Sequence, residues 1–231
     1  MGGHWVRRIR DELGQELLRD ITLVCLAVGV VGASYGAITV SEGLPTWTPS
    51  YMSVVVFAGA SQFLFTGVVA AGGSPVAAVV AGLLVNARHL PFGFALADTV
   101  KDHRLFGSYL MIDEVVAFAL AQRDPHRRRV AFFTCGVMLW VCWNIGSLLG
   151  ALAGTAITDT DAFGLDAAFP AVLVALVLPG LRDRTTRAPA LLGAVIALAL
   201  TPFLPSGLPV LFSLFGLVLA RPGRHFEEVA A

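Results

Sequence analysis

The stretch Val-Asn-Ala-Arg-His at 85–89 places the polar side chains of Asn86, Arg88 and His89 inside a long apolar run. An arginine at the centre of a membrane helix is unfavourable by roughly 2.5 to 3.5 kcal/mol, so it is usually paired, buried in protein or in contact with water. Its guanidinium is a planar fork that matches a carboxylate. Arg88 therefore either binds a substrate carboxylate or forms a structural ion pair with an acid on another helix, and the sequence leaves both interpretations open.

A proline follows this stretch at position 91. Proline lacks a backbone N–H and disfavours helical geometry in the preceding residue. We therefore expect the apolar segment 76–97 to be kinked or broken between Asn86 and Pro91. Transporters use such breaks to hold a substrate near the middle of the membrane.

Two adjacent acids, Asp113 and Glu114, lie in the middle of the short apolar segment 106–121. Adjacent helical residues point about 100° apart, so we expect at most one of them to face a given pocket. One acid can pair with Arg88, while the other can bind an ammonium group or carry a proton. If the segment is shorter than it looks, both acids instead lie near a membrane interface.

Two further amides complete the candidate set. Gln62 lies in the stretch Phe-Ala-Gly-Ala-Ser-Gln-Phe at 57–63 and either bridges helices or holds polar groups of a ligand. Asn144 shares a helix face with Trp140, four residues earlier, and we expect it to face a central cavity. The candidate substrate-binding or coupling residues are Gln62, Asn86, Arg88, His89, Asp113, Glu114 and Asn144.

The composition defines what kind of protein must position these residues. Of the 231 residues, 56% are hydrophobic and 14% are charged, whereas soluble domains carry about 25% charged residues. The apolar runs are continuous, which favours membrane helices over the alternating pattern of a membrane barrel. We predict an all-α fold, a polytopic transmembrane helical bundle.

The apolar residues fall into eight segments, near 21–40, 51–71, 76–97, 106–121, 130–153, 165–181, 188–203 and 207–220. Short connections indicate a single transmembrane domain over 21–231. Residues 1–20 contain four acids and four arginines, and apolar residues recur there every four positions, which predicts an amphipathic helix at the cytoplasmic membrane surface.

The last two segments contain 16 and 14 residues and are interrupted by Pro202, Pro205 and Pro209. A full span needs about 20 residues, so these segments either cross the membrane as short helices or form a re-entrant pair.

Thirteen of the sixteen basic residues fall in the stretches 1–20, 122–129, 182–187 and beyond 220. The positive-inside rule places these stretches, and with them both termini, in the cytoplasm. With eight crossings, the loop 98–105, which contains Lys101 and Arg104, is expected on the outer side.

Gly146, Gly150 and Gly154 recur every four residues, as do Gly32 and Gly36. Small residues at this spacing let two helix backbones approach closely. We therefore expect a helix-packing seam on each of the two segments.

The run Gly32-Ala33-Ser34-Tyr35-Gly36 matches the nucleophile elbow of serine hydrolases, and His89 could serve as its base. That motif requires a strand–turn–helix setting, whereas here it lies in an apolar helix. The intramembrane hydrolase is thus a minor alternative. The sequence has no Walker-type loop and no run of metal ligands, so we expect no cofactor and no metal.

The residues at 57–63 and 85–89, together with Asp113-Glu114, resemble the AzlC family, the large subunit of two-component branched-chain amino acid exporters. The resemblance extends over most of the chain. It implies a transporter, not an enzyme, that exports leucine, isoleucine and valine across the bacterial cytoplasmic membrane, and it allows methionine as well.

The resemblance also implies a small AzlD-type membrane partner and alternating access driven by the proton gradient. In this interpretation Arg88 binds the substrate carboxylate, Asp113 or Glu114 takes the ammonium or a proton, and Gln62 and Asn86 orient the ligand. The main alternative is an accessory or assembly subunit whose partner forms the pore.

Overall fold

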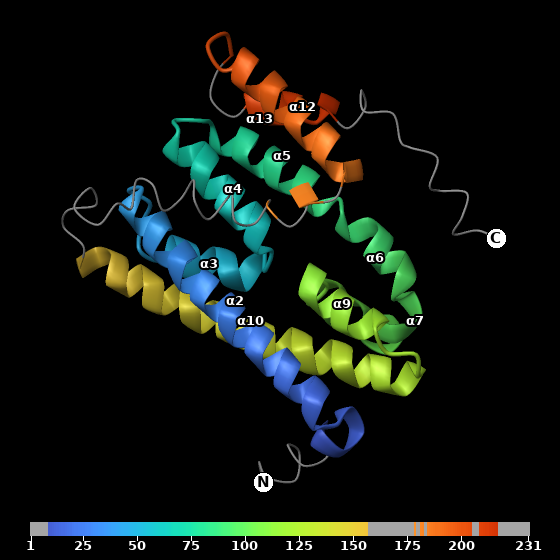
Figure 1. Cartoon of the computed structure of the whole chain (residues 1–231). Helices are drawn as coiled ribbons and strands as arrows, with labels where there is room; N and C mark the ends of the chain where they lie inside the picture. The colour runs from blue at the N-terminus through green and yellow to red at the C-terminus, as the bar shows by residue number, and fades with distance from the viewer. Residues whose placement is uncertain (1–8, 157–177, 179–180, 183, 205–207, 217–231) are drawn as a thin grey trace. The chain divides into compact units, whose positions relative to one another are not determined.

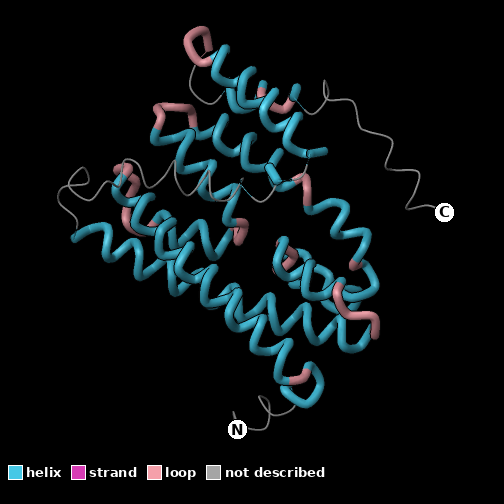
Figure 2. The backbone as a smooth tube through the Cα atoms, viewed as in Figure 1, coloured by secondary structure: helices cyan, strands magenta, loops and turns pink. Residues whose placement is uncertain are grey.

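The computed structural model describes residues 9–156, 178, 181–182, 184–204 and 208–216, and these form helices and turns with no strand among them (Figure 2). Three helical stretches of the described residues are long and apolar enough to cross a membrane: Gln15–Ser41, Pro75–Ala95, which includes a two-residue turn at 87–88, and Pro125–Thr155. The helical membrane class is therefore confirmed. The number of eight segments stays a prediction, and segment 165–181 lies almost wholly outside the described residues.

The chain divides into two compact units, one from Met1–Gln62 with Leu84–Asp159 and the other from Phe63–Leu83 with Thr160–Ala231. Every candidate site residue belongs to the first unit. The helices that matter for the site are α2 (Gln15–Ser41), α3 (Thr48–Val55), α6 (His89–Ala95), α8 (Arg104–Tyr109), α9 (Asp113–Leu120) and α10 (Pro125–Ala156).

The first unit is built on α2 and α10, which lie side by side (Figure 1). A Cβ atom on Gly150 would lie 1.9 Å from the carbonyl oxygen of Ala33, and one on Gly146 would lie 2.0 Å from that of Gly29. On α2, a Cβ on Gly36 would lie 2.1 Å from the carbonyl oxygen of Ser147. The predicted packing seams are confirmed, and they face each other within one chain.

The helices α2 and α10 run parallel, so their N-terminal ends meet. Residues 9–13 are helical and turn into α2 at Gly14, whose φ of 78° is a conformation that favours glycine. Arg127 Nη2 donates a hydrogen bond of 2.6 Å to the carbonyl oxygen of Leu13, and His126 lies 3.5 Å from the Glu12 carboxylate. Residues 9–20 and 122–129 thus lie together, and we call this the basic end of the unit.

The prediction that loop 98–105 lies on the side opposite to 122–129 is wrong. Asp102 in this loop forms an ion pair with Arg129, and His103 contacts Phe133 edge to face at a ring distance of 6.0 Å. Groups in direct contact cannot lie on opposite faces of a hydrocarbon layer about 30 Å thick. The loop therefore belongs to the basic end, and a parity count of apolar segments placed it incorrectly.

Two predicted continuous segments are interrupted. Segment 51–71 contains α3 and α4 (Gly59–Ala70), separated at Phe57, whose φ of 38° is uncommon for a bulky residue. Segment 106–121 contains α8 and α9, separated at Leu110–Ile112. Both interruptions fall on bulky apolar residues, which give no proline or glycine signal at the turn itself.

In the second unit, α12 (Arg184–Leu200) packs against α13 (Leu208–Phe212) and the turn that follows. A Cβ on Gly193 would lie 2.6 Å from the carbonyl oxygen of Ser213, so the two backbones approach closely here. This unit also contains most of α4 and of α5 (Pro75–Asn86).

Candidate functional site

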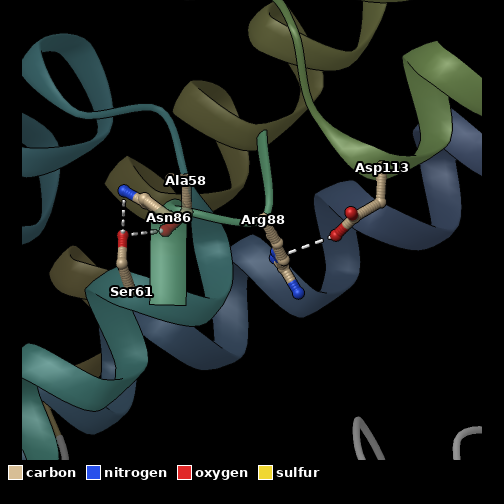
Figure 3. A network of polar contacts seen from close by, with 5 residues as sticks. All are labelled: Ala58, Ser61, Asn86, Arg88 and Asp113. Atoms are coloured by element: carbon tan, nitrogen blue, oxygen red, sulfur yellow. Dashed lines mark hydrogen bonds and ion pairs between the residues drawn. The ribbon is translucent and has the colours of Figure 1, made fainter. Parts of the chain in front are cut away.

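An ion pair between Arg88 and Asp113 is the centre of the site (Figure 3). Arg88 Nη2 lies 2.8 Å from Asp113 Oδ2, and the two side chains are 43% and 45% exposed. The pair is therefore charge-balanced and still reachable by a ligand. The structure thus shows the ion pair that the sequence left as one of two interpretations, and its exposure keeps the substrate interpretation open.

Arg88 lies between two helices. Helix α5 ends at Asn86 and α6 begins at His89, while Ala87 and Arg88 form a turn. The hydrogen bonds across this turn, from Ala87 N–H to the Leu84 oxygen and from Leu90 N–H to the Ala87 oxygen, span three residues instead of four. Pro91 falls in the first turn of α6, where a missing N–H is tolerated.

Asn86 lies beside the ion pair and contacts α4. Its Nδ2 donates a hydrogen bond of 3.2 Å to Ser61 Oγ, and Ser61 Oγ donates one of 2.8 Å to the carbonyl oxygen of Ala58 (Figure 3). The Asn86 Oδ1 atom is buried and has no hydrogen-bond partner within the described residues. An acceptor in that state can receive a hydrogen bond from a ligand.

Gln62 is fully buried and belongs to a second polar chain. Its Nε2 donates to Ser53 Oγ at 3.2 Å, and Ser53 Oγ donates to Ser147 Oγ at 3.0 Å, so the chain links α4, α3 and α10. The Oε1 atom of Gln62 is buried without a partner in the described part of the chain. Gln62 thus bridges helices, as one of its two predicted roles requires, and keeps one acceptor free.

The remaining candidates lie outside the ion pair itself. Glu114 follows Asp113 in the first turn of α9 and has no ion pair among the described residues. His89 begins α6, and its Nε2 is buried without a described partner. Asn144 Nδ2 donates to the Trp140 carbonyl oxygen at 2.9 Å within α10.

Tyr109 is a residue that the sequence interpretation missed. Its hydroxyl donates to the carbonyl oxygen of Val54 and accepts a hydrogen bond of 2.7 Å from Trp140 Nε1, and its ring lies 5.8 Å from that of Phe57. Tyr109, which lies four residues before Asp113, therefore joins the end of α3 to α10. A tyrosine in an apolar segment gave a weak signal because such residues are common at membrane interfaces.

The hydrolase elbow lacks the setting that its chemistry needs. Ser34 lies inside α2, and its hydroxyl donates at 3.3 Å to the Val30 carbonyl oxygen one turn earlier. This is the ordinary hydrogen bond of a serine within a helix. A nucleophile elbow places the serine on a sharp turn after a strand, and the described residues contain no strand.

The AzlC protein family matches residues 23–157, which include every candidate residue and the seam between α2 and α10. This match covers more than half of the chain, so the chain belongs to the AzlC family. None of the solved structures matches it.

Several relatives are membrane proteins. An uncharacterized membrane protein of Helicobacter pylori strain 26695 is 26% identical over 85% of this chain and 88% of its own length. The inner membrane protein YgaZ of Escherichia coli is 28% identical over 71% of this chain and 67% of its own. The branched-chain amino acid transport protein AzlC of Bacillus subtilis is 26% identical over 64% of this chain and 60% of its own length.

Proposed function

We propose that this chain is the large subunit of a secondary transporter that exports branched-chain amino acids across the bacterial cytoplasmic membrane. Membership of the AzlC family and the name of the Bacillus relative support the substrate class. The single observation that carries the proposal is the half-exposed ion pair between Arg88 and Asp113 at the turn between α5 and α6.

The ion pair suits a zwitterion. An amino acid carries one carboxylate and one ammonium group close together, which are complementary to a guanidinium and a carboxylate. A substrate that inserts between Arg88 and Asp113 exchanges one charge-balanced pair for two, so neither protein charge is left unpaired. The interruption of the helix there matches the broken helices on which transporters build substrate sites.

The amides supply orientation. The free acceptors Gln62 Oε1 and Asn86 Oδ1 can receive hydrogen bonds from the substrate ammonium group. The substrate side chain then lies against an apolar wall, which selects aliphatic amino acids. His89 and Asn144 are assigned to the surroundings of the site, and Glu114, which has no described ion pair, is the candidate proton carrier.

Energy coupling, orientation and partner belong to the same proposal. The basic end of the first unit faces the cytoplasm under the positive-inside rule, and so do both termini. The proton gradient drives export by alternating access, and a small AzlD-type membrane subunit assembles with this chain. No cofactor and no enzymatic activity are proposed.

One observation weakens the alternative of an accessory subunit. The glycines at 146, 150 and 154 could have formed an interface with a partner, but they face α2 of the same chain. They are therefore already covered and give no separate support for a partner-formed pore.

The test is amino acid efflux from cells fed leucine-containing dipeptides, with this chain expressed alone and together with its candidate small subunit. Faster leucine efflux that requires both proteins supports the proposal. No change, with both proteins present in the membrane, contradicts the substrate class. Transport by the purified chain alone excludes the accessory role.

A further inference from the structure

Helix α8 begins at the basic end of the first unit, and helix α9 ends there. Just before α8, Asp102 pairs with Arg129, and in its first turn Phe106 stacks on Phe133 with ring centroids 6.2 Å apart. Just after α9, the carbonyl oxygen of Gln122 accepts a hydrogen bond of 3.1 Å from Arg128. All three contacts are made with the first turns of α10, so residues 104–121 leave the basic end and return to it.

The depth of the turn can be measured along α10. Arg129 contacts the start of this segment, Gly136 lies against Leu110, and Trp140 donates to Tyr109. Trp140 is eleven residues beyond Arg129 in one helix, which corresponds to about 16 Å at a rise of 1.5 Å per residue. The turn therefore lies about halfway through a hydrocarbon core of about 30 Å.

We propose that α8 and α9 form a re-entrant hairpin that enters the membrane from the basic end, and that its tip, residues 109–113, is the gate between the substrate site and that end. Their six and eight residues correspond to about 9 and 12 Å of helix, too short for either to cross the membrane. The gating role rests on the proposed transport function, whereas the re-entrant path does not.

The tip carries the acid of the ion pair. Asp113 is the first residue of α9 and reaches Arg88, which lies outside the hairpin. When the tip moves away from Arg88, the ion pair separates and the substrate site opens toward the basic end. When the tip returns, the ion pair forms again and the site closes. Such a movement also releases Tyr109 from Val54 and Trp140.

The base of the hairpin has room for such movement. A cavity of about 790 Å³ lies between residues 9–12, the start of α8 and the first turns of α10, and Phe106 and Phe133 line it. On α8, Leu105 is 91% exposed and Phe106 is 49% exposed, whereas Leu110 at the tip is 1% exposed and lies against Gly136 of α10. The seam of α2 and α10 shows the opposite character, with backbones in direct contact.

The re-entrant path is tested by labelling, which needs no substrate. In a background with Cys25, Cys135 and Cys142 replaced by alanine, single cysteines are introduced as Arg104→Cys, Arg123→Cys and Glu42→Cys. Intact and permeabilised cells are treated with a membrane-impermeant maleimide. The hairpin requires Arg104→Cys to behave like Arg123→Cys and opposite to Glu42→Cys. Labelling of Arg104→Cys together with Glu42→Cys would overturn the proposal.

The gate is tested by cross-linking. A Cβ on Gly136 would lie 3.1 Å from Leu110 Cβ, so the pair Leu110→Cys and Gly136→Cys is close enough for a disulfide to α10. The single variants Leu110→Cys and Gly136→Cys, treated with the same oxidant, are the controls, because neither of them can form this disulfide. Oxidation should stop leucine efflux in the hairpin variant, reduction should restore it, and the controls should be unaffected.

The labelling and cross-linking tests distinguish a failure of the gate from a failure of the proposed transport function. Full efflux with the hairpin disulfide formed, as verified by mass spectrometry, overturns the gate. If the unmodified chain and its partner export no branched-chain amino acid, the proposed function fails, while labelling still decides whether the hairpin is re-entrant.

Discussion

Two regions of the first unit differ in packing and in exposure. One is the seam between α2 and α10, and the other is the polar group around Arg88. In the seam, glycines bring backbones so close that a single Cβ at position 150 would overlap the Ala33 carbonyl oxygen. Around Arg88, the ion pair is nearly half exposed, and the buried Oδ1 acceptor of Asn86 has no partner among the described residues. One region has no adjustable contact, whereas the other has polar groups that a ligand can satisfy.

This difference separates scaffold from site. Close-packed backbones have one arrangement and resist change. Half-exposed charges and free acceptors can exchange partners at little free-energy cost, as binding and release require. Changes in the seam should therefore act on folding, and changes around Arg88 should act on transport.

The largest effect is expected in the seam, for Gly150→Ala. The added Cβ would lie 1.9 Å from a backbone oxygen that cannot rotate away, so the two helices must separate. We expect destabilisation at or above the roughly 3 kcal/mol upper end of usual overpacking penalties, with loss of folded protein in detergent. Thermal unfolding and membrane yield measure it.

Gly93→Ala is the matched control for this substitution. A Cβ atom added to Gly93, in α6, would have no neighbouring atom within 4 Å, so alanine should be neutral or stabilise the helix by up to about 1 kcal/mol. Equal behaviour of the two variants would contradict the contrast between seam and site.

Next in size is Arg88→Ala. Removal of one partner of a charged pair costs about 2–5 kcal/mol in binding, so leucine efflux should fall at least about thirtyfold. Since the pair is nearly half exposed, the stability of the protein should change by no more than about 1 kcal/mol.

The exchanged pair Arg88→Asp with Asp113→Arg shows whether the role is structural. A purely structural ion pair would be restored by the exchange, and transport would recover. A substrate site would remain inactive, because each charge would then face a substrate group from the wrong position.

A smaller effect is expected for Gln62→Met. This change removes one hydrogen bond to Ser53 but also a buried acceptor without a partner, so unfolding free energy should change by less than about 1 kcal/mol. Efflux should fall about tenfold if Oε1 binds the ammonium group, the equivalent of about 1.4 kcal/mol. Ser147→Ala, which affects the same polar chain at its far end, should leave efflux unchanged. Equal losses in both variants would indicate a structural role for Gln62.

The smallest effect is expected for Asp102→Asn at the base of the hairpin. The hydrogen bond from Arg129 lowers the pKa of the Asp102 carboxyl below its ordinary value of 3.8. A lowered folded-state pKa adds stability above the ordinary value, and this contribution is lost as the pH falls through the folded pKa. The difference in melting temperature between parent and variant should be small at neutral pH and vanish in acid. A difference that grows in acid would contradict this assignment.

Several elements could be predicted from the sequence because their signals are local. The glycine spacing at 146, 150 and 154 predicted the seam, since small residues on one face allow close approach. The charge of Arg88 inside an apolar run predicted a partner. The turns at Phe57 and at Leu110–Ile112 could not be predicted, because nothing in those residues opposes a helix.

Composition, periodicity and desolvation act residue by residue, so they were sufficient to predict a helical membrane protein with an arginine, acids and amides inside its apolar segments. They could not show which acid meets Arg88 or to which end loop 98–105 belongs, and these answers came from the folded chain. Both depend on where the chain turns inside the membrane. A short apolar hairpin and a short apolar span have nearly the same composition, so packing against α10 alone distinguishes them.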